Sequence, residues 1–253
     1  MINIDELGAR IIFTISIGDG NLYITESTVF GVIVAVIIAG LGIWMGSGLK
    51  MIPTGKKQIA AEAMVGWIYK FTRENMGRAN EGYAPYIGTI FAFILFGSSL
   101  GIFGLRPVTA DLNVTAALAI MTFMIIQISG IRKLGVKGRL KEMAEPYPFI
   151  FPMKVLEELT LPVSLALRLF GNIFGGVIVV DLWMGFMEYL SGLLTDVPFL
   201  RAVTVLPLNG FFDMFEPVIQ TYIFTMLTMV NLASAIGGVA NSTVTKLPDS
   251  RAS

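Results

Sequence analysis

Apolar stretches long enough to cross a bilayer recur along the chain, with short polar connections between them. Four of these runs contain no charged residue: 27–49, 82–105, 112–131 and 217–245. A fifth, 159–180, is apolar apart from Arg168. A helix needs about 20 predominantly apolar residues to span a membrane, and a soluble helix is rarely apolar all round for that length. The pattern therefore predicts an all-α integral membrane protein with about five transmembrane helices.

The segment from about residue 54 to residue 80 has a different pattern. Wound as a helix, it gathers apolar residues on one face (Ala60, Met64, Trp67, Ile68 and Phe71) and charged ones towards the other (Glu62, Lys70, Arg73 and Glu74). Such a helix suits the membrane surface, with its apolar face towards the acyl chains. We expect one amphipathic interfacial helix here; the alternative is a soluble connector.

Composition narrows the chemistry that the chain can perform. Hydrophobic residues make up 55% of the sequence and charged residues 14%, and the formal net charge is zero, so nothing points to nucleic acid as a partner. The chain has no cysteine and no histidine. Disulfides, thiolate ligands and the commonest proton shuttle and metal ligand are therefore excluded. We expect no cofactor and no metal site, so ionic work falls to arginine, carboxylates and neutral polar groups.

Basic residues are concentrated in alternate connections, which predicts an orientation. They follow the first span (Lys50, Lys56, Lys57, Lys70, Arg73, Arg78), follow the third (Arg132, Lys133, Lys137, Arg139, Lys141) and close the chain (Lys246, Arg251). By the positive-inside rule these connections are cytoplasmic. We expect a cell-membrane protein with its N-terminus outside and its C-terminus in the cytoplasm. It would form one membrane domain, 1–253, with scaffold helices in 1–131, a cytoplasmic loop at 132–148 and a working hairpin in 149–253.

Charges and prolines set the last two spans apart from the first three. The fourth carries Glu157, Glu158, Arg168, Asp181 and Glu188, and the fifth carries Asp213 and Glu216; Pro162 and Pro217 are expected to interrupt them. An arginine at the bilayer centre costs about 2.5–3.5 kcal/mol on insertion scales, so it is retained mainly where it has a function. We expect these two helices to carry the function.

Two polar stripes lie on this hairpin. Ser164, Arg168 and Asn172 are four residues apart, so they stack on one helical face. Glycines 171, 175 and 176 keep the helix thin beside that face, which allows close approach of another helix. On the fifth span, Asp213, Glu216 and Gln220 form a second stripe, with Gln220 expected near the depth of Arg168.

Simpler interpretations remain open for these residues. Arg168 could form a static salt bridge with Asp213 or Glu216 that only holds two helices together. Gln220 could make an ordinary interhelical hydrogen bond. Asp181 and Glu188 are expected near the outer interface, solvated and without a role.

Longer motifs in the chain resemble a known family. They are PTGKKQIAAEA at 53–63, PVTADLNVTAALA at 107–119, EPYPFIFPMKVLEELTLPVSLALRL at 145–169, LPVSLALRLFGNIFGG at 161–176 and IQTYIFTMLTMV at 219–230. Together they resemble subunit a of the F-type ATP synthase from about residue 53 onwards, and Arg168 matches the essential arginine of that family.

The resemblance implies a stator for ion flow and no catalytic chemistry on ATP. In this family two long, tilted helices lie against a rotating ring of c subunits, and two offset half-channels carry H+ or Na+ to and from the ring carboxyls. The arginine stands between the half-channels. The resemblance also implies a b-subunit peripheral stalk and the rest of the F1Fo complex as partners, within a lipid bilayer. Further positions match residues along the ion path: Asn172 and Gln220 beside the arginine, Ser164 on the cytoplasmic access side, and Glu157 and Glu158 near the inner end of the fourth span.

The chain departs from the family pattern at the outer side. Val177 stands where some members have an acidic residue or histidine, Asp213 where some have histidine or glutamate, and Glu216 where the residue is often apolar. Outer-channel residues therefore do not carry over one by one. Two other classes remain: a secondary transporter with an arginine–carboxylate site at the midplane, although the repeated halves common in such folds are absent, and a purely structural membrane anchor.

Overall fold

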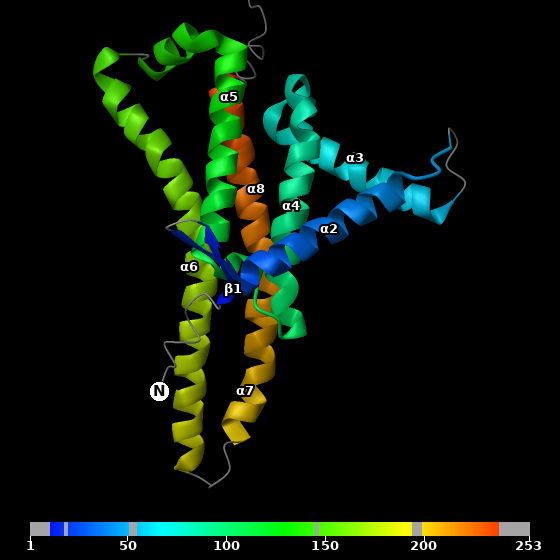
Figure 1. Ribbon diagram of the computed structural model, residues 1–253, viewed down its shortest axis with the longest axis vertical. Helices are drawn as coiled ribbons and strands as arrows, with labels where there is room; N and C mark the ends of the chain where they lie inside the picture. Colours follow the sequence, from blue (N-terminus) through cyan, green and yellow to red (C-terminus); the bar gives the residue numbers. More distant parts are fainter. Residues whose placement is uncertain (1–10, 18–19, 51–54, 145–146, 194–198, 238–253) are drawn as a thin grey trace, which may run out of the picture. The chain divides into compact units, whose positions relative to one another are not determined.

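A computed structural model describes residues 11–17, 20–50, 55–144, 147–193 and 199–237 (Figure 1). Its residues group into two compact units. Unit 1 comprises Met1–Gly40, Ala92–Leu118 and Ser164–Tyr222; unit 2 comprises Leu41–Phe91, Ala119–Val163 and Ile223–Ser253. Helices α6 (Phe151–Gly192) and α8 (Glu216–Ala235) each contribute residues to both units.

Helices dominate the described chain. The α-helices are α2 (Glu26–Gly46), α3 (Lys56–Met76), α4 (Ala84–Ser98), α5 (Leu112–Ala144), α6 (Phe151–Gly192), α7 (Phe199–Gly210) and α8 (Glu216–Ala235). Short 3-10 turns are η1 (Arg78–Tyr83), η2 (Ser99–Phe103), η3 (Val108–Ala110) and η4 (Pro148–Ile150), and a π-helical turn, η5 (Phe211–Phe215), joins α7 to α8.

Five helical segments are long and apolar enough to cross a membrane, which confirms the expected number for the described chain. They are Glu26–Gly46, Arg78–Phe103, Leu112–Lys141, Phe151–Gly192 and Phe199–Ala235. Many of their large apolar side chains are exposed, among them Val36 and Ile43 on α2. An exposed apolar surface on this scale is unfavourable in water but suits lipid. The fold is that of an α-helical integral membrane protein.

A β-hairpin precedes the first span, and nothing in our sequence analysis anticipates it. Strand β1 (Ile11–Ile17) pairs antiparallel with β2 (Gly20–Thr25), in register from Phe13 opposite Ile24 to Ile17 opposite Gly20. At the end of β2, Thr25 Oγ1 donates a hydrogen bond of 2.6 Å to Asp111 Oδ2. Asp111 also accepts from the backbone N–H of Asn113 at the start of α5, so one carboxylate serves the hairpin and a helix N-terminus.

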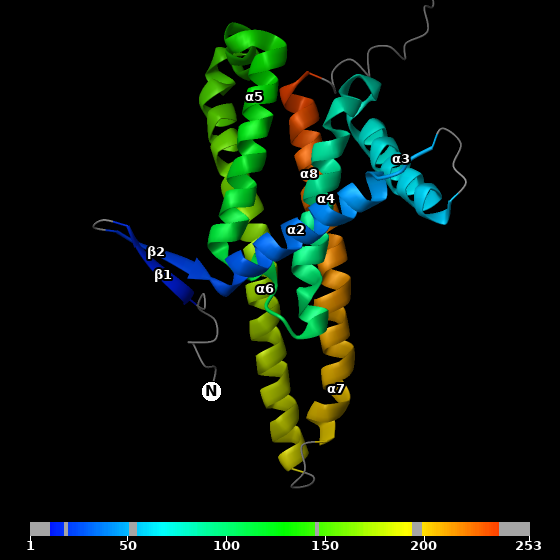
Figure 2. The ribbon, with the colours of Figure 1, turned by 45° about the vertical axis from the view of Figure 1, so that its right-hand side comes forward.

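Unit 1 is held together by close contacts between small and branched residues. The Val108 side chain packs against Gly31 of α2 and Gly97 of α4. A Cβ added at either glycine would lie only 3.2 Å from it. Beside this contact, the hydroxyls of Ser98 and Thr109 are 2.9 Å apart. In the same unit, the C-terminal part of α6 and helix α7 run antiparallel and side by side (Figures 1 and 2).

Unit 2 has an apolar core built from α3, α4, α5 and α8. Its buried members are Met76, Ile87, Ile126, Met229, Leu232, Ala233, Ala235 and Ile236. Helix α3 confirms a helix in the segment expected to be amphipathic. Part of its apolar face packs on α4: Ile68 lies against Gly88, and the Trp67 ring meets the Phe91 ring edge-on at 5.3 Å.

Two local expectations need correction. The connection at 132–148 is largely helical, because α5 continues to Ala144 through a kink at Gly135, whose φ of 72° suits glycine. Pro162 does not interrupt the fourth span: α6 continues through it. A proline deprives a helix of one hydrogen bond, but α6 is nevertheless continuous from Phe151 to Gly192.

Candidate functional site

Helix α6 in unit 1 has one packed face and one open face. Leu165, Leu169 and Gly176 are buried. Consecutive residues are about 100° apart around a helix, which puts Arg168 and Gly175 together on a neighbouring face. A Cβ added at Gly171 or Gly175 would meet no atom within 4 Å, whereas one at Gly176 would lie 2.9 Å from the Phe212 ring. Two of the three glycines therefore leave open the face that carries Arg168, and the third packs inside the chain.

Arg168 makes no hydrogen bond or ion pair with any residue that the structure describes. The ion pairs of the described chain include Arg139 with Glu158 and Arg201 with Glu188, but none joins Arg168 to Asp213 or Glu216. The static salt bridge that the sequence leaves open is thus absent. A permanent charge within a membrane-spanning helix needs a counter-charge or water, and the described chain supplies no counter-charge.

Asn172 and Gln220 connect the two helices of the hairpin. Asn172 Nδ2 donates a hydrogen bond of 2.5 Å to Gln220 Oε1. Gln220 is only 5% exposed, and its Nε2 has no hydrogen-bond partner among the described residues. The interhelical hydrogen bond that the sequence left open as an alternative is therefore present, but the amide N–H group has no partner among the described residues. A buried donor without an acceptor costs about 1–3 kcal/mol, which favours an acceptor other than the described residues.

A π-helical turn, η5, contains Asp213 and ends directly before Glu216. In η5, the N–H of Glu216 bonds to the carbonyl of Phe211, and Pro217 follows at once. A π turn accommodates one extra residue and is frequent at functional sites. Because Asp213 lies within the turn and Glu216 follows it, the two side chains do not share the single stripe that regular helical spacing predicts: Asp213 faces Gly101 and Glu216 faces Gly176.

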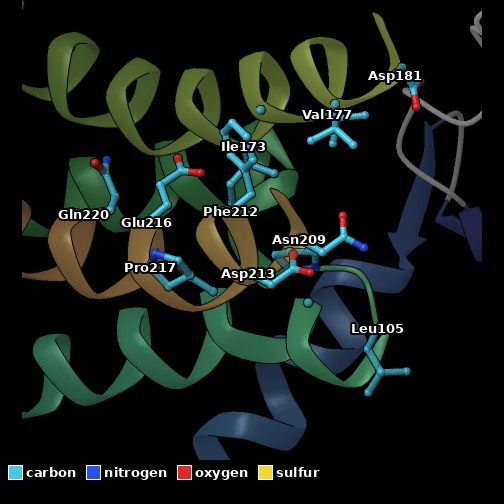
Figure 3. Close-up of a pocket in the computed structure, with 16 residues that line it drawn as sticks. Leu105, Ile173, Val177, Asp181, Asn209, Phe212, Asp213, Glu216, Pro217 and Gln220 are labelled. Atoms are coloured by element: carbon cyan, nitrogen blue, oxygen red, sulfur yellow. The ribbon is translucent and has the colours of Figure 1, made fainter. Parts of the chain in front are cut away.

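A cavity of about 270 Å³ in unit 1, which we call the first cavity, contains both carboxylates (Figure 3). Asp213 lies on the side of η2: a Cβ added at Gly101 would be 2.6 Å from its Oδ1. Glu216 points towards α6, where a Cβ at Gly176 would be 3.6 Å from its Oε2. Gln220 also lines the cavity. The carboxylates occupy different walls of one space.

Asp181 and Glu188 differ from each other. Glu188 pairs with Arg201 at 2.8 Å in an exposed position, in agreement with a solvated residue. Asp181 lines the first cavity together with Asn209, and sequence reasoning assigned no role to either. The position of Asp181 in the sequence does not indicate that it lines a cavity. Its place there depends on how α6 packs against α7.

Glu157 and Glu158 lie in unit 2, in a second cavity of about 200 Å³. Glu158 accepts from Gln127 Nε2 at 2.8 Å and pairs with Arg139. Glu157 is exposed and makes no such contact with the described residues. Ser164 is exposed on α6. Sequence reasoning counted Arg139 only among the basic residues of a connection, since nothing in a run of basic residues singles out one that turns inwards.

Together, these features define a multi-pass helical membrane protein with ionisable groups around two cavities. Comparison with known proteins identifies the family. Residues 28–233 match the family described as ATP synthase A chain. The chain is 36% identical to ATP synthase subunit a of Moorella thermoacetica, over 84% of this chain and 91% of that protein. It is 32% identical to ATP synthase subunit a, sodium ion specific, of Propionigenium modestum, over 77% and 68% respectively.

The chain belongs to the ATP synthase subunit a family. This family provides the ion-channel subunit of the Fo membrane sector within the F1Fo ATP synthase. Membership leaves no reason to prefer a secondary transporter or a structural anchor, the two rival classes that the sequence alone leaves open.

Proposed function

We propose that this chain is the stator that carries H+ or Na+ to and from the carboxyls of a rotating c ring. In this proposal two half-channels open on opposite sides of the cell membrane, and Arg168 separates them. Ion flow is thereby coupled to ATP synthesis or hydrolysis, whose chemistry takes place in other subunits. The c ring and a b-subunit peripheral stalk are the direct partners.

One observation carries the proposal: Arg168 has no partner among the described residues and lies on the open face of α6 beside Gly171 and Gly175. An unpaired guanidinium on a thin helix surface is suited to meet a carboxylate of another subunit. Glycine at these positions allows that subunit to approach closely. A residue that only held two helices together would be paired inside the chain.

The proposed role follows from the energies of charges in a membrane. A ring carboxyl that faces lipid must be neutralised by its ion, but opposite Arg168 it can be charged. Two unit charges 4 Å apart attract by about 4 kcal/mol at an effective dielectric of 20, which is enough to favour release of the ion. The same charge repels a free cation that would pass directly between the half-channels. Each charge that crosses 100 mV supplies about 2.3 kcal/mol for rotation.

The first cavity suits the outer half-channel. Asp213 and Glu216 supply carboxylates on two of its walls, and Gln220 lies beside Asn172, one helical turn from Arg168. The unused Nε2 of Gln220 can donate to water or to a ring carboxylate. The second cavity, with Glu157 and Glu158, and the exposed Ser164 are assigned to the inner half-channel.

Both ions remain within the proposal. The Propionigenium relative is described as sodium ion specific, but the choice of ion depends on ligands around the ring carboxyl, which another chain supplies. We expect the sequence of the partner c subunit to decide it. A polar cluster around its carboxyl would indicate Na+, and an apolar surround would indicate H+.

The orientation has its own test. The basic residues after the third span put residues 132–141 in the cytoplasm under the positive-inside rule. An epitope tag inserted there is expected to bind antibody only after the cells are permeabilised. Binding on intact cells would reverse the topology, with the N-terminus inside.

Replacement of Arg168 tests the function itself. We expect Arg168→Ala to abolish ATP-driven ion pumping and ion-driven ATP synthesis while the complex still assembles, because the residue has no structural partner in the described chain. Arg201→Ala is the matched control: Arg201 is an arginine of the same hairpin in an exposed ion pair, and near-normal pumping is expected. Pumping at the wild-type rate in Arg168→Ala would refute the proposal.

A further inference from the structure

The second cavity contains two adjacent acidic residues in different environments. Both oxygens of Glu158 are engaged: Oε1 pairs with Arg139 Nη2, and Oε2 accepts from Gln127 Nε2. Glu157 lines the same cavity but makes no hydrogen bond or ion pair within the part of the chain that the structure describes. From the sequence, Glu157 and Glu158 look equivalent. Their contacts in the structure show that they differ.

Arg139 is held from several sides. It is 8% exposed, and its Nη1 lies 3.5 Å from the carbonyl of Ala235, the last residue of α8. A cation at the C-terminus of a helix is stabilised by the unpaired carbonyls and the helix dipole. The same guanidinium pairs with Glu158 of α6. Arg139 thereby connects the folded-back end of α5 with the two long helices of the hairpin.

Two glycines make this position possible. Gly135, with its φ of 72°, breaks α5 and lets the segment that carries Arg139 turn back. Gly130 leaves a notch beside the side chain: a Cβ added there would lie 3.0 Å from the Ala235 carbonyl and 3.2 Å from Arg139 Nε. The backbone at Gly135 and at Gly130 therefore fixes the position of Arg139, in contrast to the flexible side chains of a surface ion pair.

We infer that Arg139 and Glu158 form a permanent clamp that positions α6 and α8 around the second cavity, and that Glu157 is the acid there which exchanges ions. The inference rests on the proposed function, and it divides two residues to which the family resemblance gives one role. Glu158 is a positioning residue, because its charge is used by Arg139. Lys154, the other cation that lines the cavity, has no hydrogen bond or ion pair among the described residues.

The two acids provide a matched pair of variants. Glu157→Gln and Glu158→Gln make the same chemical change at neighbouring positions of the assembled complex. For Glu157→Gln we expect normal assembly and heat stability. Its ion pumping per complex should fall roughly tenfold, less than the ~100-fold typical for loss of a catalytic proton-transfer group, because water in the cavity takes over part of the transfer. For Glu158→Gln we expect less assembled complex and dissociation of subunit a at lower temperature.

Charge reversal separates a specific pair from general damage. Arg139→Glu and Glu158→Arg should each prevent normal assembly, because each leaves like charges buried together. The double variant Arg139→Glu/Glu158→Arg should recover assembly and heat stability. No recovery beyond the better single variant would overturn the clamp. Normal pumping in Glu157→Gln, or its failure to assemble, would overturn the assignment of the exchanging acid.

These outcomes are distinguishable from failure of the proposed function. Ion pumping by the Arg168→Ala complex is measured in parallel, in the same assay as the Glu157→Gln complex. If that variant is inactive and Glu157→Gln is normal, only the present inference fails. If Arg168→Ala pumps normally, the proposed function fails, whereas rescue by charge reversal still tests the clamp.

Discussion

Two arginines of this chain occupy opposite electrostatic situations. Arg139 in unit 2 is buried, paired with Glu158 and close to the carbonyl at the end of α8. Arg168 in unit 1 has no counter-charge among the described residues and lies beside an open glycine face. The first arrangement uses a cation to hold helices together. In the function we propose, the second keeps a cation available for the carboxylate of another subunit.

The comparison shows why the role of a charged residue in a membrane helix cannot be inferred from the free-energy cost of inserting it into the membrane. Both side chains carry the same charge, and arginine retains that charge where lysine can lose it. The roles that we propose for them differ because an acid lies within reach of Arg139 but not of Arg168 among the described residues. Arg201, paired with Glu188 at the surface, is a third case, in which an exposed pair is worth only about 0–1 kcal/mol.

The difference between the two arginines is tested most directly by giving Arg168 an acidic partner within its own chain. Ser164 precedes it by one helical turn, so Ser164→Glu places an acid at the favourable i, i+4 spacing. We expect ion pumping to fall at least tenfold, equivalent to about 1.4 kcal/mol, because the new acid competes with the ring carboxyl for the guanidinium. Ser164→Gln, of similar size and neutral, should lose much less. Equal losses in the two variants would mean that size, not charge, matters at this position.

A second change tests whether the open face is a contact surface. In Gly175→Leu the added Cβ would meet no atom of the described chain within 4 Å, so the subunit itself should fold and insert. We expect less c ring to co-purify with it, because the proposed contact with the ring requires close approach at this surface. Gly42→Leu on α2 makes the same change at another open glycine and should leave ring binding intact. Normal ring binding in Gly175→Leu would place the rotor elsewhere.

A smaller effect is expected at the first cavity. Asp213→Asn should slow pumping several-fold, because Glu216 remains in the same cavity as a second carboxylate. Glu188→Gln, outside that cavity and in an exposed pair, should change pumping little. The native chain has no cysteine, so a single cysteine at 213 or 216 gives an unambiguous probe. Reaction with aqueous silver ions from the outside is expected, and protection of both positions would exclude an outer channel here.

Much of the architecture is predictable from the sequence because lipid imposes simple rules. Apolar runs of sufficient length predict the five spans, and the amphipathic pattern predicts the helix now seen as α3. The β-hairpin is not predictable in this way, since a short strand pair next to a membrane span carries no comparable length signal. The helical end of α5 is missed for a related reason: its charged residues indicate the side of the membrane and say little about backbone conformation.

The candidate site is predictable where spacing along one helix decides it. The Ser164, Arg168 and Asn172 face follows directly from a four-residue repeat. The engagement of Glu158 by Arg139 depends on a kink at Gly135 and a notch at Gly130, which only tertiary structure reveals. Asp181 enters the first cavity for a similar reason: its place there is set by the neighbouring helix.

The wide turn at Phe211–Phe215 has a consequence for how relatives should be aligned. The π-helical turn contains one more residue than a regular helical turn. The residues before it that face the cavity therefore lie one position further from Gln220 in the sequence than they would in a regular helix. A homologue without the bulge would present a different alignment column to the same space. Equivalent outer-channel acids in this family should therefore be sought by superposition of backbones, because column-by-column comparison can report a substitution where there is only a shift in phase.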